Sequence, residues 1–259
     1  MPVIHLNHNL VHYQVDGAAG LPWLVFSNSL GTDLRMWDAQ AAFFSRDFRV
    51  LRYDTRGHGG SAGAPADTST IDQLGQDVLA LLDARDIARA HFCGLSLGGM
   101  IAQWLAIHAP QRLDKLVIAN SAPRIGTAQG WHERAAQVRS NGMDAVADSA
   151  AARWFTPAFR QAAPVRVAAL VAQLRATIPD GYAQCCAALA TADLRADIAC
   201  IAAPTLLIAG AHDPVTTVVD AHAMQDAIAG ATVVTLAASH ISNIEAPTEF
   251  NRVLREFLG

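Results

Sequence analysis

Residues 91–100 read HFCGLSLGGM, and this stretch places Ser96 between Gly94 and Gly98. The residues before Ser96 form an apolar run typical of a buried strand, and those after it are typical of a buried helix. Glycine on both sides carries an entropic cost, so it indicates a backbone that needs glycine. A Gly-x-Ser-x-Gly pattern at a strand-to-helix turn is typical of a nucleophilic serine. Ser96 is therefore the candidate nucleophile, and the alternative is an ordinary capping serine in a tight turn.

The segments around this turn alternate between apolar runs and helical patterns. Strands are expected at residues 3–6, 10–16, 23–28, 49–54, 90–95, 115–122, 204–210 and 232–238. Helices are expected at residues 36–44, 71–85, 100–109, 218–229 and 249–258. The first two strands alternate polar and apolar residues, as antiparallel edge strands do. Continuous apolar strands alternating with helices predict an α/β fold, with a mostly parallel eight-stranded sheet and helices on both faces.

Residues 124–190 interrupt the alternation. They contain no convincing strand pattern, but they include helical stretches at 131–140 and 164–176 and are rich in alanine, which favours helix. We expect an all-helical cap, or lid, inserted after the sixth strand. The α/β core would then be formed by residues 1–123 and 191–259.

Two polar residues follow the last two predicted strands and supply the partners that a nucleophilic serine needs. Asp213 lies in AHDPVT, after the strand at 204–210, and His240 lies in SHISNIE, after the strand at 232–238. The carboxyl ends of parallel strands meet at one edge of a sheet, where sites in α/β proteins form. The order serine, acid, histidine is also the order expected for this topology. The sequence therefore predicts a triad of Ser96, Asp213 and His240.

Both partners also have simpler structural interpretations. Asp213 precedes Pro214, as ordinary turn aspartates do, and His240 is compatible with a helix-entry residue. His212 competes with His240 for the role of base, but as the immediate neighbour of Asp213 it is poorly placed to be oriented by that carboxylate. The matching positions at the ends of consecutive strands favour the triad.

The loop after the strand at 23–28 is small and polar, in the sequence FSNSLGTDLRMW. The N–H of Leu30 is the expected second oxyanion donor beside the N–H of Leu97, although these residues would also serve a plain turn. A second glycine-rich loop, YDTRGHGGS at 53–61, lacks the helix immediately after it that a phosphate loop needs. We assign its polar side chains to loop structure: Asp54, Arg56 and His58.

Composition limits the partners. The 259 residues are 52% hydrophobic and 16% charged, with a net charge of -4, and the scattered basic residues do not predict binding to nucleic acid or to an anionic membrane. The four cysteines have no zinc-site spacing, and we find neither a signal peptide nor an apolar run of roughly 20 residues. We expect a soluble protein of the cytoplasm.

Taken together, the motifs SNSLG, YDTRGHGGS, GLSLGG, AGAHDP and SHISNIEAP resemble the α/β-hydrolase superfamily over the whole chain. Within it, SNSLGTDLRMWD, GLSLGGMIAQWLA, ANSAPRIGT, RWFTPAF and GYAQCCAALATADLR resemble the 3-oxoadipate enol-lactone hydrolases of bacterial aromatic catabolism. Asn28-Ser29 stands where many relatives carry His-Gly, which leaves a backbone oxyanion donor unaffected. The resemblance implies a Ser-His-Asp hydrolase that opens the enol-lactone ring to give 3-oxoadipate, without metal or organic cofactor.

Such a substrate carries a carboxylate, for which a cation or several N–H donors are expected. Trp131 and Arg134 are three residues apart on one predicted cap helix and share a face, and Trp154 follows Arg153 in a second. Trp131, Arg134 and Trp154 are the candidate substrate-binding residues. The alternative is that the tryptophans pack in the cap and the arginine is solvated.

Three other functions are consistent with the same motifs. A broader carboxylesterase or perhydrolase would share the triad and differ in the cap. A carbon–carbon bond hydrolase would need further polar groups for a dienolate, and a small-molecule receptor would expose an apolar surface to a partner. The expected partner is a small lactone or ester, and the sequence leaves a homo-oligomer open.

Overall fold

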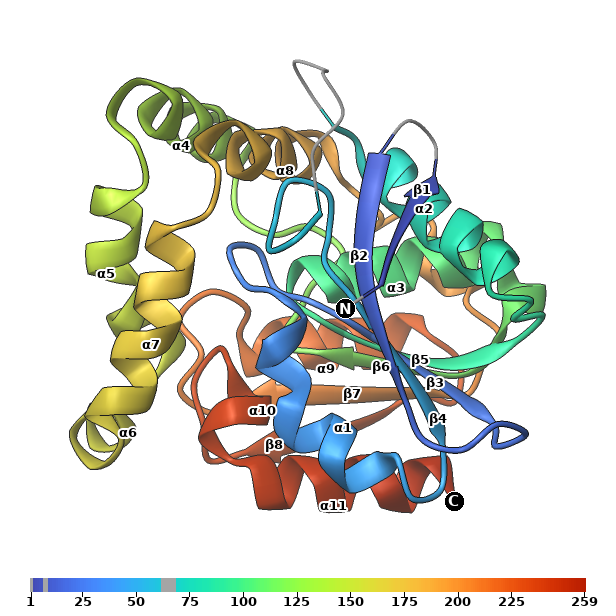
Figure 1. Ribbon diagram of the computed structural model, residues 1–259. Helices are drawn as coiled ribbons and strands as arrows, with labels where there is room; N and C mark the ends of the chain where they lie inside the picture. Colours follow the sequence, from blue (N-terminus) through green and yellow to red (C-terminus); the bar gives the residue numbers. More distant parts are fainter. Residues whose placement is uncertain (1, 7–8, 62–68) are drawn as a thin grey trace.

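The computed structural model describes residues 2–6, 9–61 and 69–259, and its centre is an eight-stranded sheet (Figure 1). The strand order is β1-β2-β4-β3-β5-β6-β7-β8. The strands are β1 Val3–Leu6, β2 Asn9–Asp16, β3 Trp23–Ser27, β4 Arg49–Tyr53, β5 Ala90–Leu95, β6 Leu113–Ala119, β7 Thr205–Gly210 and β8 Thr232–Leu236. The β1–β2 and β2–β4 pairs are antiparallel and the other pairs are parallel, which confirms the predicted sheet with antiparallel strands at one edge.

Helices cover both faces of this sheet. The core helices are α1 Asp38–Phe44, α2 Ile71–Ala84, α3 Leu97–His108, α9 Val218–Ala227, α10 Ser242–Glu245 and α11 Pro247–Leu258. Helices α1 and α11 pack together on one side, and α2, α3 and α9 lie on the other (Figure 1). Every residue of α3 from Leu97 to Ala106 is buried, which explains why this helix is apolar on all sides.

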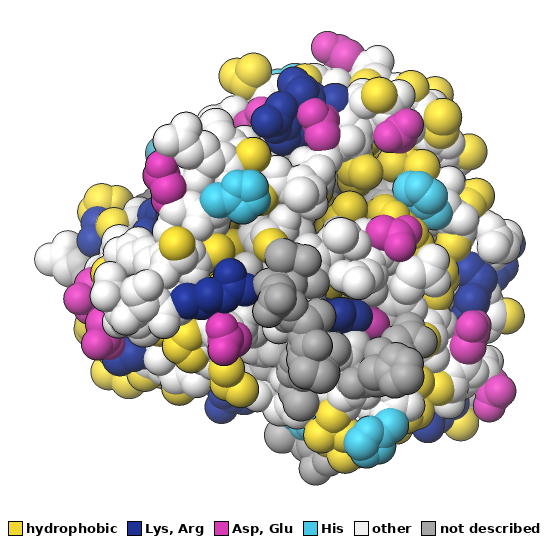
Figure 2. Space-filling view, turned by 90° about the horizontal axis from the view of Figure 1, so that it is seen from above, with side chains coloured by type: hydrophobic (Ala, Val, Ile, Leu, Met, Phe, Trp, Pro, Cys, Tyr) yellow, Lys and Arg dark blue, Asp and Glu magenta, His cyan; other side chains and the backbone are white. Residues whose placement is uncertain are grey.

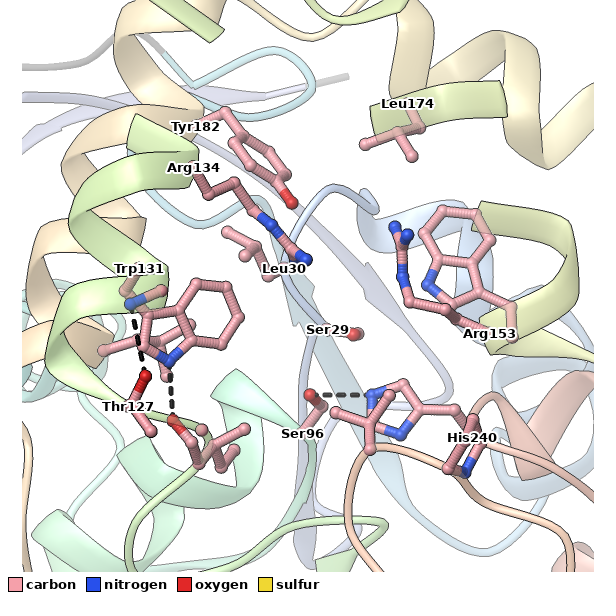
Figure 3. A pocket seen from close by; sticks show the side chains of 17 residues that line it. Ser29, Leu30, Ser96, Thr127, Trp131, Arg134, Arg153, Leu174, Tyr182 and His240 are labelled. Carbon is pink, nitrogen blue, oxygen red and sulfur yellow. Dashed lines mark hydrogen bonds between the residues drawn. The ribbon is translucent and has the colours of Figure 1, made fainter. Parts of the chain in front are cut away.

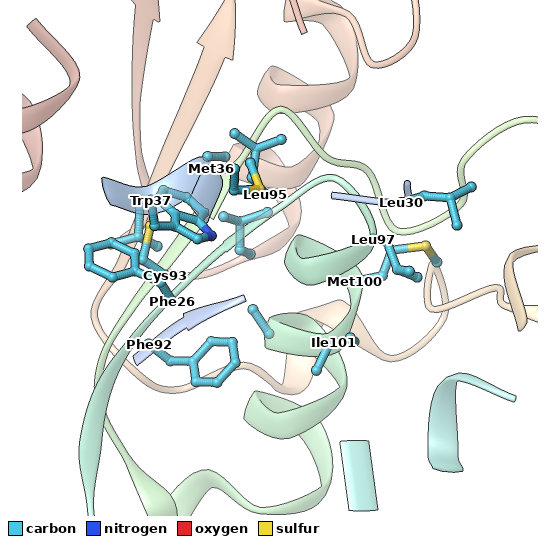
Figure 4. Packing of buried hydrophobic residues seen from close by; sticks show 14 of the residues in the cluster. Phe26, Leu30, Met36, Trp37, Phe92, Cys93, Leu95, Leu97, Met100 and Ile101 are labelled. Carbon is cyan, nitrogen blue, oxygen red and sulfur yellow. The ribbon is translucent and has the colours of Figure 1, made fainter. Parts of the chain in front are cut away.

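The apolar strands and helices form one core, which includes Leu95 and Leu97 on either side of Ser96 in the sequence (Figure 4). Phe26 of β3 stacks on Trp37 with ring centroids 4.6 Å apart, and Phe92 of β5 is fully buried. Both β3 and β5 are buried along most of their length, as central strands of a covered parallel sheet are. The turn after β5 is therefore built on a closely packed base.

The cap lies between β6 and β7, as predicted, and in the described residues it is entirely helical (Figure 1). It contains α4 Ala128–Asn141, α5 Asp144–Trp154, α6 Pro157–Ala162, α7 Pro164–Arg175 and α8 Pro179–Thr191. Three of these helices begin at a proline, which suits the first helical position because it has no N–H to leave unpaired. The two ends of the insertion meet where the Leu194 N–H donates to the Pro123 carbonyl, at 2.9 Å. The helices run from residue 128 to 191, against the predicted segment 124–190.

Some local details differ from the sequence expectations. The helix expected at 36–44 starts as a 3-10 turn at Leu34–Trp37, because the Asp33 side chain caps the Arg35 N–H. The sequence does not predict the short helix α10, which begins two residues after His240.

On the face shown in Figure 2, basic and acidic side chains are interspersed. No helix in the described part of the chain is both long and apolar enough to span a membrane.

Candidate active site

Ser96 lies in the turn between β5 and α3 with a φ of 58° and a ψ of -114°. Such a backbone conformation is rare for a residue with a side chain and costs about 1–3 kcal/mol. Glycine is required at positions 94 and 98 because backbone atoms of other residues lie too close for a side chain. A Cβ on Gly94 would lie 2.0 Å from the Gly98 carbonyl oxygen, and a Cβ on Gly98 would lie 2.2 Å from that of Ser27. The sharp turn holds the Ser96 side chain at the carboxyl edge of the sheet, as the motif predicts.

Ser96, His240 and Asp213 form a hydrogen-bonded row, and Figure 3 shows the contact between Ser96 and His240. His240 Nε2 lies 2.9 Å from Ser96 Oγ, and His240 Nδ1 lies 2.8 Å from Asp213 Oδ2. All three residues are buried. With Asp213 ionised, Nδ1 carries the imidazole proton, and Nε2 accepts from the serine hydroxyl. The structure thus brings the three predicted residues together, whereas the competing His212 is exposed.

Asp213 accepts four hydrogen bonds besides that from His240. Its Oδ1 accepts from the N–H groups of Val215 and Thr216, at 2.8 and 3.1 Å. Its Oδ2 accepts from the Thr216 hydroxyl at 2.8 Å and from Asn120 Nδ2 at 3.0 Å. Burial acts to raise the pKa of this carboxyl, but the hydrogen bond and charge of His240, with the Asn120 and Val215 donors, outweigh burial and lower the pKa. Asp213 is therefore an anion at neutral pH.

Asn120 is a residue of the site that the sequence analysis missed. It follows β6 directly, with a φ of 44°, a left-handed conformation that asparagine tolerates better than most residues. Its amide donates to Asp213 and, at 3.2 Å, to the Ser239 carbonyl, and its oxygen accepts from the Ser242 hydroxyl. A signal was present, since Asn120 comes directly after a buried strand, at the same sheet edge as Ser96.

The two predicted oxyanion donors lie beside Ser96. Leu97 is the first residue of α3, so its N–H has no acceptor within the helix. Leu30 lines the same cavity as Ser96, and no acceptor for its N–H is found among the described residues. The Gly98 N–H donates to the Asn28 carbonyl at 3.0 Å, which holds the Leu30 loop against α3. Among the described residues, neither N–H group thus has a protein acceptor.

The polar side chains of the glycine-rich loop at residues 53–61 form hydrogen bonds and ion pairs with neighbouring segments. Asp54 accepts from the Leu34 N–H at 2.7 Å and from the Gly60 N–H at 2.8 Å, and it pairs with His12. Arg56 pairs with Asp77 in a buried ion pair. These side chains therefore hold loops in place, as expected from the sequence.

A cavity of about 400 Å³ lies above Ser96 and His240, between the core and the cap. Its apolar lining includes Leu30, Ile125, Trp131, Trp154, Leu174 and Leu189. Its lining among the described residues contains two arginines, Arg134 and Arg153, and no carboxylate. The structure places all three predicted cap residues in this lining: Trp131, Arg134 and Trp154.

Arg153 on α5 and Tyr182 on α8 also line the cavity, and the sequence does not predict that they bind substrate (Figure 3). Burial raises the pKa of the Tyr182 hydroxyl to about 12, against the opposing charges of Arg134 and Arg153. Tyr182 is thus a neutral hydrogen-bonding group near both arginines. Nothing in the local sequence marks Tyr182, because α8 reaches the cavity only through the packing of the cap.

Glu245 links the cap to the loop that contains His240. Its carboxylate accepts from the Ser239 N–H at 2.8 Å, from the Thr156 N–H at 3.1 Å and from the Thr156 hydroxyl. The Ile241 N–H donates to the Trp154 carbonyl at 3.1 Å. The end of α5 and the histidine loop are therefore hydrogen-bonded to each other.

Known proteins that resemble this chain match it over nearly its whole length. Residues 22–247 match the family model described as the alpha/beta hydrolase fold. The chain is 48% identical to 3-oxoadipate enol-lactonase 2 of Acinetobacter baylyi, over 98% of this chain and 97% of the relative. It is 43% identical to 3-oxoadipate enol-lactonase 1 of the same bacterium, over 95% and 91% of the two chains. The crystal structure of the enol-lactonase from Burkholderia xenovorans LB400 superposes with a TM-score of 0.97, at 45% identity and 99% coverage of both chains.

Proposed function

This chain belongs to the α/β-hydrolase family, and on that basis we propose that it is an enol-lactonase that hydrolyses 3-oxoadipate enol-lactone to 3-oxoadipate in aromatic catabolism. One observation carries the proposal. Ser96 Oγ lies 2.9 Å from His240 Nε2 at the floor of an apolar cavity whose lining contains two arginines and, among the described residues, no carboxylate. A lactone that bears a carboxylate suits both the nucleophile and the cavity.

The first half of the proposed reaction forms an acyl-enzyme. His240 accepts the Ser96 hydroxyl proton as Oγ attacks the lactone carbonyl carbon. The N–H groups of Leu30 and Leu97 donate to the oxyanion of the tetrahedral intermediate, and loss of one such donor typically costs about 3–4 kcal/mol. Asp213 fixes the His240 tautomer and stabilises the imidazolium.

Collapse of the intermediate breaks the ring C–O bond. The leaving oxygen departs as an enolate, a better leaving group than an alkoxide, and takes the proton from His240 before it becomes the ketone. The opened chain stays attached to Ser96 as an ester. His240 then deprotonates a water that hydrolyses this ester, so one water is consumed and every proton transfer is assigned to His240 or water.

In this proposal the cap recognises the rest of the substrate. Arg134 binds the carboxylate, and the indole rings of Trp131 and Trp154 form apolar walls beside the lactone ring. Their places in the cavity lining support these roles. A location in the cytoplasm is part of the proposal and is supported by four cysteines that are free thiols, Cys93, Cys185, Cys186 and Cys200.

The test is a steady-state comparison of kcat/KM for 3-oxoadipate enol-lactone and for a simple aryl acetate, with Ser96→Ala as the blank. We expect a preference for the lactone of several orders of magnitude. Weak, comparable rates on both substrates would instead indicate a broader carboxylesterase. No Ser96-dependent turnover of either would favour a carbon–carbon bond hydrolase or a receptor.

A further inference from the structure

We propose that Arg153 and Arg134 together form the binding site for the substrate carboxylate, and that Arg153 is a specificity-determining residue that selects anionic lactones over neutral ones. This inference rests on the proposed function, because it identifies the part of that substrate which the cap recognises. It extends the proposed role of Arg134 to a residue on another helix.

The two arginines reach the cavity from different cap helices. Arg134 projects from α4 and Arg153 from α5, and both guanidinium groups point into the space above Ser96 and His240 (Figure 3). A carboxylate between them would lie within the cavity, away from the scissile bond. Two planar guanidinium groups offer several N–H donors to its oxygens.

Arg134 and Arg153 differ from Arg139 and Arg175 of the cap in having no acidic partner among the described residues. Arg175 pairs with Asp144 and Asp148, and Arg139 pairs with Asp180. Within the described residues, neither Arg134 nor Arg153 forms an ion pair with a carboxylate. Their positive charges are therefore uncompensated by the protein.

Neutral groups hold both guanidinium groups in place. The Arg134 guanidinium lies over the Trp131 ring, 5.0 Å from its centroid. Arg153 donates to the Val146 carbonyl at 3.3 Å and to the Ser149 hydroxyl, both on its own helix. These contacts restrict the side chains without neutralising them, which is the arrangement expected of a preorganised anion site.

The electrostatics favour an anionic occupant. Burial lowers the pKa of Arg153, and the charge of Arg134 lowers it further, although a guanidinium stays protonated throughout the working range. Two like charges in a mainly apolar cavity are unfavourable until a counter-ion arrives. A carboxylate relieves this repulsion, whereas a neutral substituent leaves both charges desolvated and unpaired.

Two substrates with the same ring separate recognition from chemistry. One is the enol-lactone with its carboxymethyl group, and the other is the same enol-lactone with a methyl group in its place. We would measure kcat/KM for both with the wild type, Arg153→Met and Arg153→Lys. Arg166→Met, which removes an exposed cation of α7, is the matched control.

For Arg153→Met we expect kcat/KM to fall roughly ten- to a hundred-fold on the carboxymethyl lactone, the loss typical of a hydrogen bond to a charged group. The methyl lactone should change less than about two-fold, Arg153→Lys should restore part of the loss, and Arg166→Met should match the wild type. An equal loss on both lactones would mean that Arg153 only supports α5, and no loss on either would mean that it does not bind the carboxylate. Either result overturns this inference and leaves the proposed function standing. If the wild type hydrolyses neither lactone, the proposed function falls, and the inference falls with it.

Discussion

Asn120 Nδ2 lies 3.0 Å from Asp213 Oδ2, the oxygen that also accepts the Nδ1 proton of His240 at 2.8 Å. The amide is fixed in turn by the Ser239 carbonyl and the Ser242 hydroxyl. The end of β6 therefore orients the carboxylate that orients the histidine. Asn120 is not among the residues that line the cavity, and we infer that it is a positioning residue that acts through Asp213.

We predict that Asn120→Ala lowers kcat/KM about ten-fold, because a buried carboxylate loses one donor. Asn120 helps to lower the pKa of Asp213, so its removal raises that pKa. The variant should then lose activity at a higher pH than the wild type as the solution is acidified. The measurement is kcat/KM between pH 3 and 8. Asn251→Ala, which removes a buried asparagine paired with Gln40 away from the cavity, is the control. A pH profile that matches the wild type would contradict the role given to Asn120.

The charge on Asp213 should also make stability depend on pH. The folded-state pKa lies below the unfolded value of about 3.9, so the carboxylate contributes stability that is present above that value and is lost as the pH falls through the folded pKa. Asp213→Asn lacks this titration. We therefore expect the difference in unfolding free energy between wild type and variant to shrink from pH 7 to pH 3, in urea titrations at each pH. A difference equally large at both pH values would argue against a lowered pKa.

The backbone of Ser96 predicts a stability difference between two inactive variants. Ser96→Ala and Ser96→Gly both lack the nucleophile, and each should lose at least about 10⁴-fold in kcat. Alanine keeps the strain of a φ of 58°, whereas glycine adopts that conformation freely. After allowance for the greater freedom of glycine in the unfolded chain, Ser96→Gly should be more stable by about 1 kcal/mol, or roughly 2–4 °C in Tm. Calorimetry of the pair measures this, and a Tm for Ser96→Gly no higher than that of Ser96→Ala would mean that the strain does not exceed the entropic cost of glycine.

Glu245 should affect both lactones alike. Glu245→Ala leaves the Ser239 and Thr156 N–H groups without their acceptor, which should cost about 1–3 kcal/mol of stability. Because Glu245 is not itself in the cavity lining and acts through the loop of His240, kcat/KM should fall by the same factor on the carboxymethyl and the methyl lactone. Glu249→Ala, an exposed glutamate of α11 paired with Arg252, is the control and should resemble the wild type. A selective loss on one lactone would show that Glu245 takes part in recognition.

The meeting of the three candidate triad residues could be predicted because each is marked by local sequence. Ser96, Asp213 and His240 each follow an apolar run, and the carboxyl ends of neighbouring parallel strands meet at one edge. The same reasoning predicts the strands and the position of the cap, since hydrophobic periodicity is a short-range property.

The remaining site residues are brought together by contacts between distant segments. Thr156 and Glu245 are 89 residues apart, and no pattern in the sequence around either residue predicts their contact. Arg153 was seen in the sequence, but only the packing of α5 distinguishes it from the paired arginines of the cap. The spacing of apolar residues in the cap predicts helices. It does not show which side of each helix faces the cavity, so it does not show which polar side chains meet there.

The hydrogen bond between Leu194 and Pro123 closes the base of the cap. The insertion is a loop of chain that leaves the sheet and returns to the same place, with Ser96 encoded before it and Asp213 and His240 after it. One continuous segment of the gene thus carries most of the proposed recognition surface, and the flanking segments carry the proposed catalytic residues. Evolution can exchange that segment in a single recombination event and change the substrate without rebuilding the triad. The exchanged segment has to keep a partner for Glu245 at the place of Thr156.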